Sequence, residues 1–190
     1  SFIVDVTVPR LGLLKGDKAM EIIRLLTHQK TFEQLDIPLA VVATDIERGE
    51  KVVFKEGNVA MAVRASISIP GIFKPVRIDG RLLVDGAVTE RLPVSELKEM
   101  GADFTIGVDL KKWPSKRVEV RNIYEVIMQS IDVLENEASR QYLNMADFLI
   151  CPDLASVGTM DFQKADECIE IGREATLAKI EELKERLLAS

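Results

Sequence analysis

Three aspartates follow apolar runs that are typical of buried strands. Asp45 ends a run that begins at Leu39, Asp85 follows Leu82-Leu83-Val84, and Asp109 ends a run that begins at Phe104. A carboxylate in such a position can accept a proton from a reacting group. It can equally cap the turn that follows it. For any one of the three taken alone, we favour the capping interpretation.

Asp85 differs from the other two in what comes after it. Gly86 and Ala87 follow directly, so the chain can turn sharply where little backbone bulk is allowed. A carboxylate held at this corner projects from the end of a strand, within reach of a reacting group. Of the three, Asp85 is therefore the strand-end aspartate best placed to meet a reacting group, and Gly86 and Ala87 form the tight turn that follows it.

Histidine and serine are weaker candidates. His28 is the single histidine and stands beside Gln29 and Lys30 at the end of an amphipathic segment, which predicts a solvent-exposed helix end. Ser66 and Ser68 lie in the segment A-S-I-S-I-P, without the flanking glycines of a G-x-S-x-G nucleophile elbow. We predict structural roles for both serines.

Metal and nucleotide chemistry have little support. Cys151 and Cys168 are far apart, and we expect two buried thiols in a reducing compartment. With one histidine, the chain offers too few nitrogen and sulfur ligands for the common metal sites. It also contains no glycine-rich loop of the types that hold nucleotide phosphates. We predict no cofactor and no metal, and a metal-dependent hydrolase built on the strand-end aspartates is a weak alternative.

Composition indicates a globular protein with a real core. The chain has 190 residues, of which 47% are hydrophobic and 29% charged, and we predict a single domain over residues 1–190. Its net charge of −6 makes nucleic acid a poor partner. No apolar run approaches the ~18 residues needed to span a bilayer. We found no signal-peptide pattern, and we expect a cytoplasmic location. The apolar opening from Phe2 to Val8 suggests a chain cut from a longer protein.

The elements that would position these residues can be predicted from turn signals and periodicity. Asp17 is a candidate N-cap for a helix, and Asn58 is another for a helix rich in small residues. Arg48-Gly49 and Asp79-Gly80 predict two hairpins. Further predicted elements are a short helix at 96–100, strands at 104–109 and 148–151, and helices at 123–145 and 165–187, whose apolar stripes would cover a sheet. Because apolar strands alternate with helices, we predict an α/β layered fold with a mainly parallel central sheet flanked by helices.

Three motifs in one order resemble those of the patatin-like phospholipases, and most closely the bacterial branch related to neuropathy target esterase. They are the segment from Ala65 to Val76, then Val84-Asp85-Gly86-Ala87, and then Leu92-Pro93-Val94. Three linked motifs are far more specific than a lone D-G-A. The resemblance is clear from Ser1 to about Asp109 and looser toward the C-terminus.

The resemblance implies a serine–aspartate dyad that hydrolyses acyl esters without histidine. The family's D-G-A motif matches Asp85-Gly86-Ala87, whereas its G-x-S-x-G elbow and its glycine-rich oxyanion loop are not in this sequence. We therefore expect the C-terminal part of a patatin-like domain with its N-terminal elements missing. Such a chain would be inactive alone and act as an esterase or phospholipase in the longer protein. Burial should raise the pKa of Asp85.

The resemblance also implies partners. The substrate would be a lipid or a small ester, as in lipid degradation, and Trp113 could make transient membrane contact, although a solvated loop is the simpler interpretation. Missing strands would leave an open sheet edge, so we expect a homo-oligomer or association with the missing N-terminal segment. The alternative is a non-catalytic patatin-fold module for binding or regulation.

Overall fold

The computed structural model describes residues 14–110, 119–158 and 161–189. Contacts divide the chain into two compact units, Ser1–Arg91 (unit 1) and Leu92–Ser190 (unit 2). The prediction of one domain over residues 1–190 stays a prediction. The predictions for the apolar opening and for Trp113 lie outside the described residues.

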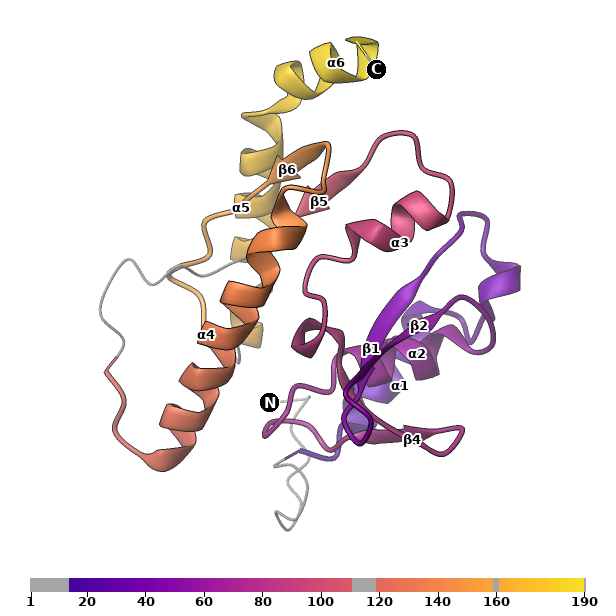
Figure 1. Ribbon diagram of the computed structural model, residues 1–190, viewed down its shortest axis with the longest axis vertical. Helices are drawn as coiled ribbons and strands as arrows, with labels where there is room; N and C mark the ends of the chain where they lie inside the picture. The colour runs from indigo at the N-terminus through magenta and orange to yellow at the C-terminus, as the bar shows by residue number, and fades with distance from the viewer. Residues whose placement is uncertain (1–13, 111–118, 159–160, 190) are drawn as a thin grey trace. The chain divides into compact units, whose positions relative to one another are not determined.

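Unit 1 combines a four-stranded sheet with helices (Figure 1). Its elements are α1 (Asp17–Leu26), η1 (Phe32–Gln34), β1 (Val41–Asp45), β2 (Glu50–Phe54), α2 (Val59–Ser66), β3 (Val76–Ile78), β4 (Arg81–Asp85) and η2 (Gly86–Val88). Both predicted hairpins are confirmed, β1 with β2 and β3 with β4. At the second turn, Asp79 and Gly80 both have positive φ, of 48° and 75°, which is the backbone that this dipeptide favours.

The prediction of a mainly parallel central sheet is wrong. The strand order is β2-β1-β4-β3, and every neighbouring pair in this sheet is antiparallel. Two of the connections are tight turns, and a parallel pair needs a crossover of a dozen or more residues. The apolar character of the strands, on which the prediction rested, reflects burial and not strand direction. The mixed α/β class itself is confirmed.

Helix α2 packs its small residues closely against the sheet. The side chain of Asn58 accepts a hydrogen bond from Met61 N at 3.1 Å, which confirms Asn58 as the N-cap. Ala65 is fully buried in one cluster with Ala43 of β1 and Leu83 of β4. A second cluster joins α2 to η1 through Phe32, Val59 and Ala62. These contacts fix the end of α2 next to the strands that carry the candidate aspartate.

The N-cap of α1 is Gly16 and not Asp17, which is the first residue of the helix. Gly16 has a φ of 82°, a conformation that glycine adopts without strain. A Cβ atom at this position would also lie within 2.6 Å of Arg64 Nε. Backbone conformation and space therefore both require glycine here.

The described residues of unit 2 form a two-stranded parallel sheet, four α-helices and one 3-10 helix. Its elements are α3 (Val94–Glu99), β5 (Ile106–Val108), α4 (Ile123–Leu143), β6 (Phe148–Ile150), η3 (Phe162–Lys164), α5 (Ala165–Leu177) and α6 (Ile180–Ala189). β5 and β6 pair in parallel, from Ile106 opposite Phe148 to Val108 opposite Ile150. Phe148, Ile150 and Leu183 form the buried cluster of this unit. The helix predicted over 165–187 is in fact two helices, α5 and α6.

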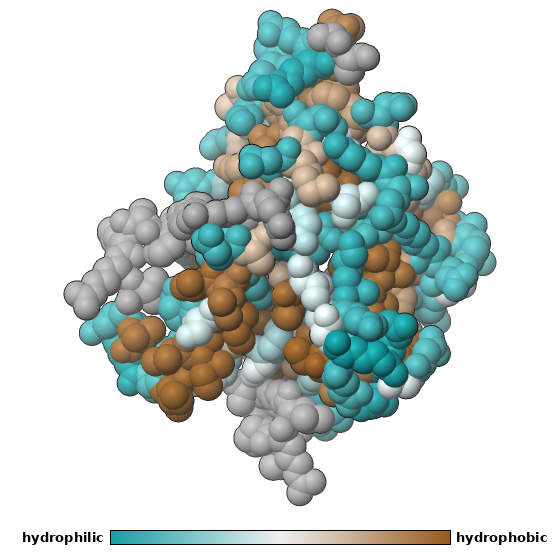
Figure 2. Space-filling model, in the orientation of Figure 1, coloured by the Kyte–Doolittle hydropathy of each residue, from teal (hydrophilic) through white to brown (hydrophobic). Residues whose placement is uncertain are grey.

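The long helix α4 confirms the predicted helix, but its apolar stripe is not covered along its length. Ile123 is 75% exposed and Leu134 is 69% exposed. Figure 2 shows apolar surface gathered over the N-terminal turns of α4. Over the described ranges, helices that combine the length and the apolar character needed to cross a bilayer are absent. Both cysteines are free, and Cys151 is exposed, so the expectation of two buried thiols is wrong.

Candidate active site

Asp85 is the last residue of β4 and the N-cap of the short helix η2. Its backbone lies opposite Ala43 of β1, and its N–H donates to the carbonyl of Ser68 at 3.0 Å. Its side chain is half-buried, and Oδ1 accepts a hydrogen bond from Ala87 N at 2.9 Å. The backbone of this residue is therefore held from two directions, and one carboxylate oxygen is fixed by the turn.

The environment of Asp85 makes its carboxyl group a weaker acid than that of an exposed aspartate. Burial raises the pKa of this carboxyl group, and the hydrogen bond from Ala87 N offsets only part of the effect. The direction is the one expected from the sequence. Within the part of the chain that the structure describes, Oδ2 accepts no hydrogen bond. This oxygen can therefore accept a proton from a donor placed beside it.

Gly86 allows the turn after Asp85 to lie directly against β1. The residue is buried, and a Cβ atom there would lie 2.9 Å from the carbonyl carbon of Val42 and closer still to its oxygen. Ala87 supplies the backbone N–H that holds Asp85 Oδ1. The small residues of the motif thus have separate roles: Gly86 permits close packing, and Ala87 contributes the capping donor.

A polar network anchors the same turn to β1 and β2. Thr89 Oγ1 lies 2.9 Å from Thr44 Oγ1 and 3.3 Å from the carbonyl oxygen of Gly86. The next residue, Glu90, is buried, and its Oε2 forms an ion pair with Lys51 Nζ at 2.7 Å. Sequence reasoning missed these residues. The one signal available was Thr44, a polar residue inside an otherwise apolar strand.

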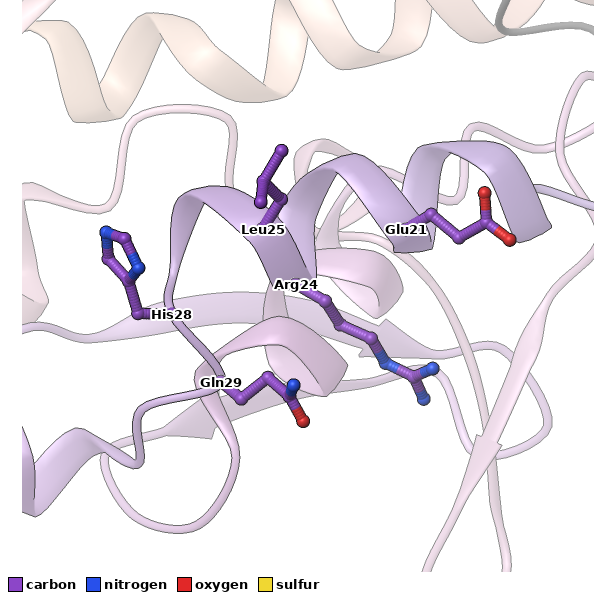
Figure 3. A pocket seen from close by; sticks show the side chains of 5 residues that line it. All are labelled: Glu21, Arg24, Leu25, His28 and Gln29. Atoms are coloured by element: carbon purple, nitrogen blue, oxygen red, sulfur yellow. The ribbon is translucent and has the colours of Figure 1, made fainter.

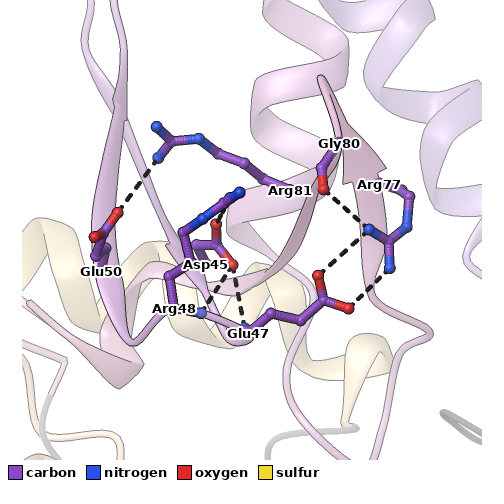
Figure 4. Close-up of polar contacts among 7 residues, drawn as sticks. All are labelled: Asp45, Glu47, Arg48, Glu50, Arg77, Gly80 and Arg81. Carbon is purple, nitrogen blue, oxygen red and sulfur yellow. Dashed lines mark hydrogen bonds and ion pairs between the residues drawn. The ribbon is translucent and has the colours of Figure 1, made fainter.

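Asp45 is a structural cap, as the capping interpretation predicted. Its Oδ1 accepts hydrogen bonds from Glu47 N and Arg48 N, and its Oδ2 is 2.8 Å from Arg48 Nη1 (Figure 4). Burial acts to raise the pKa of Asp45, but the hydrogen bonds from Arg48 and Glu47 and the charge of Arg48 together lower it. Both oxygens are engaged, so Asp45 has no free acceptor for a reacting group.

In the antiparallel register of β1 and β4, Asp85 lies opposite Ala43, two residues from Asp45. Strand β1 runs toward Asp45 and β4 runs toward Asp85, so their carboxyl ends point in opposite directions along the sheet. Asp109 belongs to unit 2, where its N–H donates to the carbonyl of Ile150 at 2.9 Å and its side chain is buried. The Asp45 carboxylate contacts Arg48 and the Asp85 carboxylate contacts Ala87 N, so the structure shows no shared contact between these two carboxylates among the described residues.

The serines of the A-S-I-S-I-P segment have different environments. The hydroxyl of Ser68 is fully buried, donates to the carbonyl of Arg64 at 2.9 Å and accepts from Arg64 Nη1 at 2.7 Å. Ser66 is half-buried at the end of α2. A hydroxyl committed to two contacts within its own segment fits the predicted structural role of Ser68.

A surface depression of about 460 Å³ lies on one side of α1 (Figure 3). It is lined by Glu21, Arg24, Leu25, His28 and Gln29, and these residues are all exposed. Asp85 is not among them. His28 is solvent-exposed at the helix end, as predicted. In the described part of the chain, no group of three or more histidine, cysteine, aspartate or glutamate side chains is placed to hold a metal ion.

A comparison with known families tests the resemblance that the sequence motifs suggested. A model of the patatin-like phospholipase family matches residues 2–98, about half of the chain, and this range contains Asp85-Gly86-Ala87. The chain belongs to the patatin-like phospholipase family. The matched range ends in α3 and includes all of the sheet in unit 1.

Several patatin-like relatives align with the chain. An uncharacterized NTE family protein of Mycobacterium tuberculosis is 39% identical over 108 residues, which cover 57% of this chain and 30% of the relative. A second NTE family protein of that organism is 26% identical over 201 residues, covering 93% and 34% respectively. Patatin-like phospholipase domain-containing protein 7 of Mus musculus is 26% identical over 204 residues, covering 90% and 15%. The chain thus spans about a third or less of the length of these relatives.

Proposed function

We propose that the protein is a serine acyl hydrolase, of the esterase or phospholipase type, that uses a serine–aspartate dyad. Asp85 is the aspartate of the dyad. The serine and the oxyanion donors belong to an N-terminal segment that this sequence does not include. The substrate is a lipid or a small carboxylic ester, and the chemistry requires no metal or organic cofactor.

The observation that carries this proposal is that the half-buried carboxyl group of Asp85 keeps one oxygen available to accept a proton. Its pKa is raised by burial, which brings proton transfer closer to the working pH of a general base. One oxygen is held by Ala87 N, while Oδ2 has no hydrogen-bond donor among the described residues. Asp45, also at a strand end, has both oxygens engaged. Membership of a phospholipase family supports the same assignment.

The proposed reaction proceeds in two steps. Asp85 Oδ2 accepts the proton of the serine hydroxyl while the serine oxygen attacks the ester carbonyl, and the proton passes to the leaving alcohol as the acyl-enzyme forms. Asp85 then accepts a proton from water, whose oxygen attacks the acyl-enzyme, and returns this proton to the departing serine oxygen as the carboxylic acid is released. Backbone N–H donors would stabilise the oxyanion in both steps, and loss of one such donor typically costs ~100–1000-fold in rate.

Labelling with a fluorophosphonate tests this proposal. The longer protein that includes the upstream segment should label at its serine, and Asp85→Asn should slow ester turnover by roughly 100–10,000-fold because the general base is lost. This chain alone should not label. Asp79→Asn is the matched control, because it removes the same charge at an exposed turn residue that asparagine can replace at positive φ. Full turnover in Asp85→Asn would contradict the dyad.

One observation favours a non-catalytic module for binding or regulation instead. Asp85 Oδ1 caps the turn through Ala87 N, and a purely structural aspartate would make the same contact. This alternative predicts that the longer protein does not label with a fluorophosphonate, or that its upstream segment lacks a G-x-S-x-G elbow. Labelling of the wild-type protein would exclude it.

A further inference from the structure

Arg64, in the last turn of α2, is a buried arginine with 5% of its surface exposed. Its Nη1 donates to Ser68 Oγ at 2.7 Å, and its Nη2 donates to the carbonyl oxygens of Lys15 at 2.7 Å and Lys74 at 3.2 Å. The guanidinium carbon also lies 5.5 Å from the centre of the Phe73 ring. One side chain thus joins α2, the segment before α1 and the segment before β3.

These segments are also joined to each other through the backbone. Leu14 N donates to Ile72 O at 2.9 Å, and Lys74 N donates to Leu14 O at 2.8 Å. The two carbonyls that Arg64 contacts lie directly beside this bridge. Taking a guanidinium out of water is costly unless its donors are satisfied. The contacts with Ser68, Lys15 and Lys74 therefore hold the surrounding backbone in one arrangement.

Ser68 transmits this arrangement to β4. Its hydroxyl is bonded to Arg64 as both donor and acceptor, which fixes the chain immediately after α2. Its backbone carbonyl accepts the N–H of Asp85 at 3.0 Å. Side chain and main chain of this one residue therefore link the buried guanidinium to the residue at the end of β4.

The contact with Ser68 occurs where the ordinary sheet pairing stops. Strand β3 pairs with β4 only from Ile78–Arg81 to Val76–Leu83, two residues short of Asp85. At Asp85, β1 lies on one side, with Ala43 opposite, and the Ser68 segment takes the place of β3 on the other. Without this segment, the main chain of Asp85 would lose one of its two lateral supports.

We propose that Arg64 is a positioning residue for Asp85 and acts through Ser68; this inference rests on the proposed function above. The guanidinium donates to Ser68 and to two backbone carbonyls, so its influence on the reacting atoms passes through the main chain. A general base must stay within hydrogen-bond reach of its donor, and a misplacement of ~1 Å can cost on the order of 100-fold in rate.

The test uses the longer protein, with Ser68→Ala and Arg64→Lys as variants. Ser68→Ala removes the hydroxyl but keeps the backbone carbonyl, so it loosens the link with little change in volume. Arg64→Lys keeps the charge but replaces the planar fork of donors with one ammonium, which cannot reach all three acceptors in the same way. Arg77→Lys is the matched control, since Arg77 contacts Glu47 and Gly80 O near the far end of the β3–β4 hairpin.

We expect kcat for an ester substrate to fall about tenfold in Ser68→Ala and roughly 10–100-fold in Arg64→Lys, by displacement of the base. KM should change less than about twofold, because ground-state binding does not involve Asp85. Circular dichroism should show both variants folded, and Ser68→Ala carries the test alone if Arg64→Lys unfolds. Arg77→Lys should keep wild-type kcat.

Two results would overturn the inference while leaving the proposed function standing. One is wild-type kcat in folded Ser68→Ala. The other is a loss of activity that appears as a higher KM at unchanged kcat, or a loss of kcat that is equally large in Arg77→Lys. A general structural role of these residues would produce either outcome. A wild-type protein that neither labels with a fluorophosphonate nor hydrolyses esters would remove the proposed function, and this inference with it.

Discussion

Asp45 and Asp85 show how one residue type at the end of a strand can have opposite protonation behaviour. Asp45 is surrounded by donors, and the hydrogen bonds and charge of Arg48 outweigh the effect of burial, so its pKa falls. Asp85 receives one backbone donor, and burial prevails, so its pKa rises. The number of donors within reach decides the direction in each case.

The raised pKa of Asp85 has a consequence for stability that needs no substrate. An acid whose pKa is higher in the folded state binds more protons there than in the unfolded state, between the two pKa values. Its contribution to the free energy of unfolding therefore declines as the pH rises through this window. Asp85→Asn removes the titration and keeps an oxygen to accept from Ala87 N.

We expect the free energy of unfolding of Asp85→Asn, minus that of the unmodified chain, to increase as the pH rises above 3.8, the ordinary pKa of an aspartate. Urea titrations followed by circular dichroism at several pH values would measure it. Asp79→Asn serves as the control for the loss of one negative charge. A difference that stays constant with pH, or that decreases, would contradict the burial of the charged form.

At the scale of elements, the site depends on how closely the turn after β4 approaches β1. Gly86 is the contact point, because its α-carbon faces the carbonyl group of Val42 without room for a side chain. Thr89 and Glu90 then tie the same turn to Thr44 and Lys51. The position of Asp85 thus follows from packing between a turn and its neighbouring strands.

Gly86→Ala should push this turn away from β1. We expect a loss of about 1–3 kcal/mol in the free energy of unfolding, the usual cost of forcing extra volume into a packed site. Gly172→Ala in α5 is the control: an added methyl group there would meet no described atom within 4 Å outside the backbone of its own helix, and alanine stabilises a helix interior by roughly 0.5–1 kcal/mol. Urea denaturation would distinguish the two, and equal stability in Gly86→Ala would argue against the close approach.

Local signals explain what could be predicted from the sequence. The hairpin at Asp79-Gly80 and the Asn58 cap were predictable because turn and cap chemistry depend on adjacent residues. Strand direction was not, since an apolar strand reads the same in parallel and antiparallel sheets. The break between α5 and α6 was missed because Ala178-Lys179 contains no glycine or proline to indicate it.

The residues of the candidate site likewise fall into those that the sequence could predict and those that it could not. Asp85-Gly86-Ala87 forms a contiguous motif, so it could be found by inspection. Its supports could not, because Thr44 and Thr89 are 45 residues apart and Lys51 and Glu90 are 39 apart. Nothing in the sequence indicated that Arg64 is buried. A charged residue in a helix is most often solvent-exposed, and only the three-dimensional structure shows that this one is buried.

At the scale of the whole molecule, each of the three buried clusters found among the described residues lies within one unit. Phe32-Val59-Ala62 and Ala43-Ala65-Leu83 belong to unit 1, and Phe148-Ile150-Leu183 belongs to unit 2. Cooperative unfolding follows packed cores. We therefore expect the two units to respond separately to a cavity made in either one.

Leu83→Ala and Leu183→Ala form a matched pair for this test. Each removes a buried leucine from one cluster and should destabilise that unit by about 2–5 kcal/mol. Hydrogen exchange measured by mass spectrometry should show faster exchange in unit 1 for Leu83→Ala and in unit 2 for Leu183→Ala. Equal acceleration across both units in either variant would show that they unfold together.

The contact between Gly16 and Arg64 constrains the routes by which relatives of this chain can diverge. A smaller residue at position 64 leaves glycine at 16 unharmed, whereas a side chain at 16 would occupy the space of the guanidinium and adopt a strained backbone. Substitution is therefore asymmetric: the arginine can be lost first, but the glycine cannot. Lineages that keep this arginine are bound to keep the glycine as well.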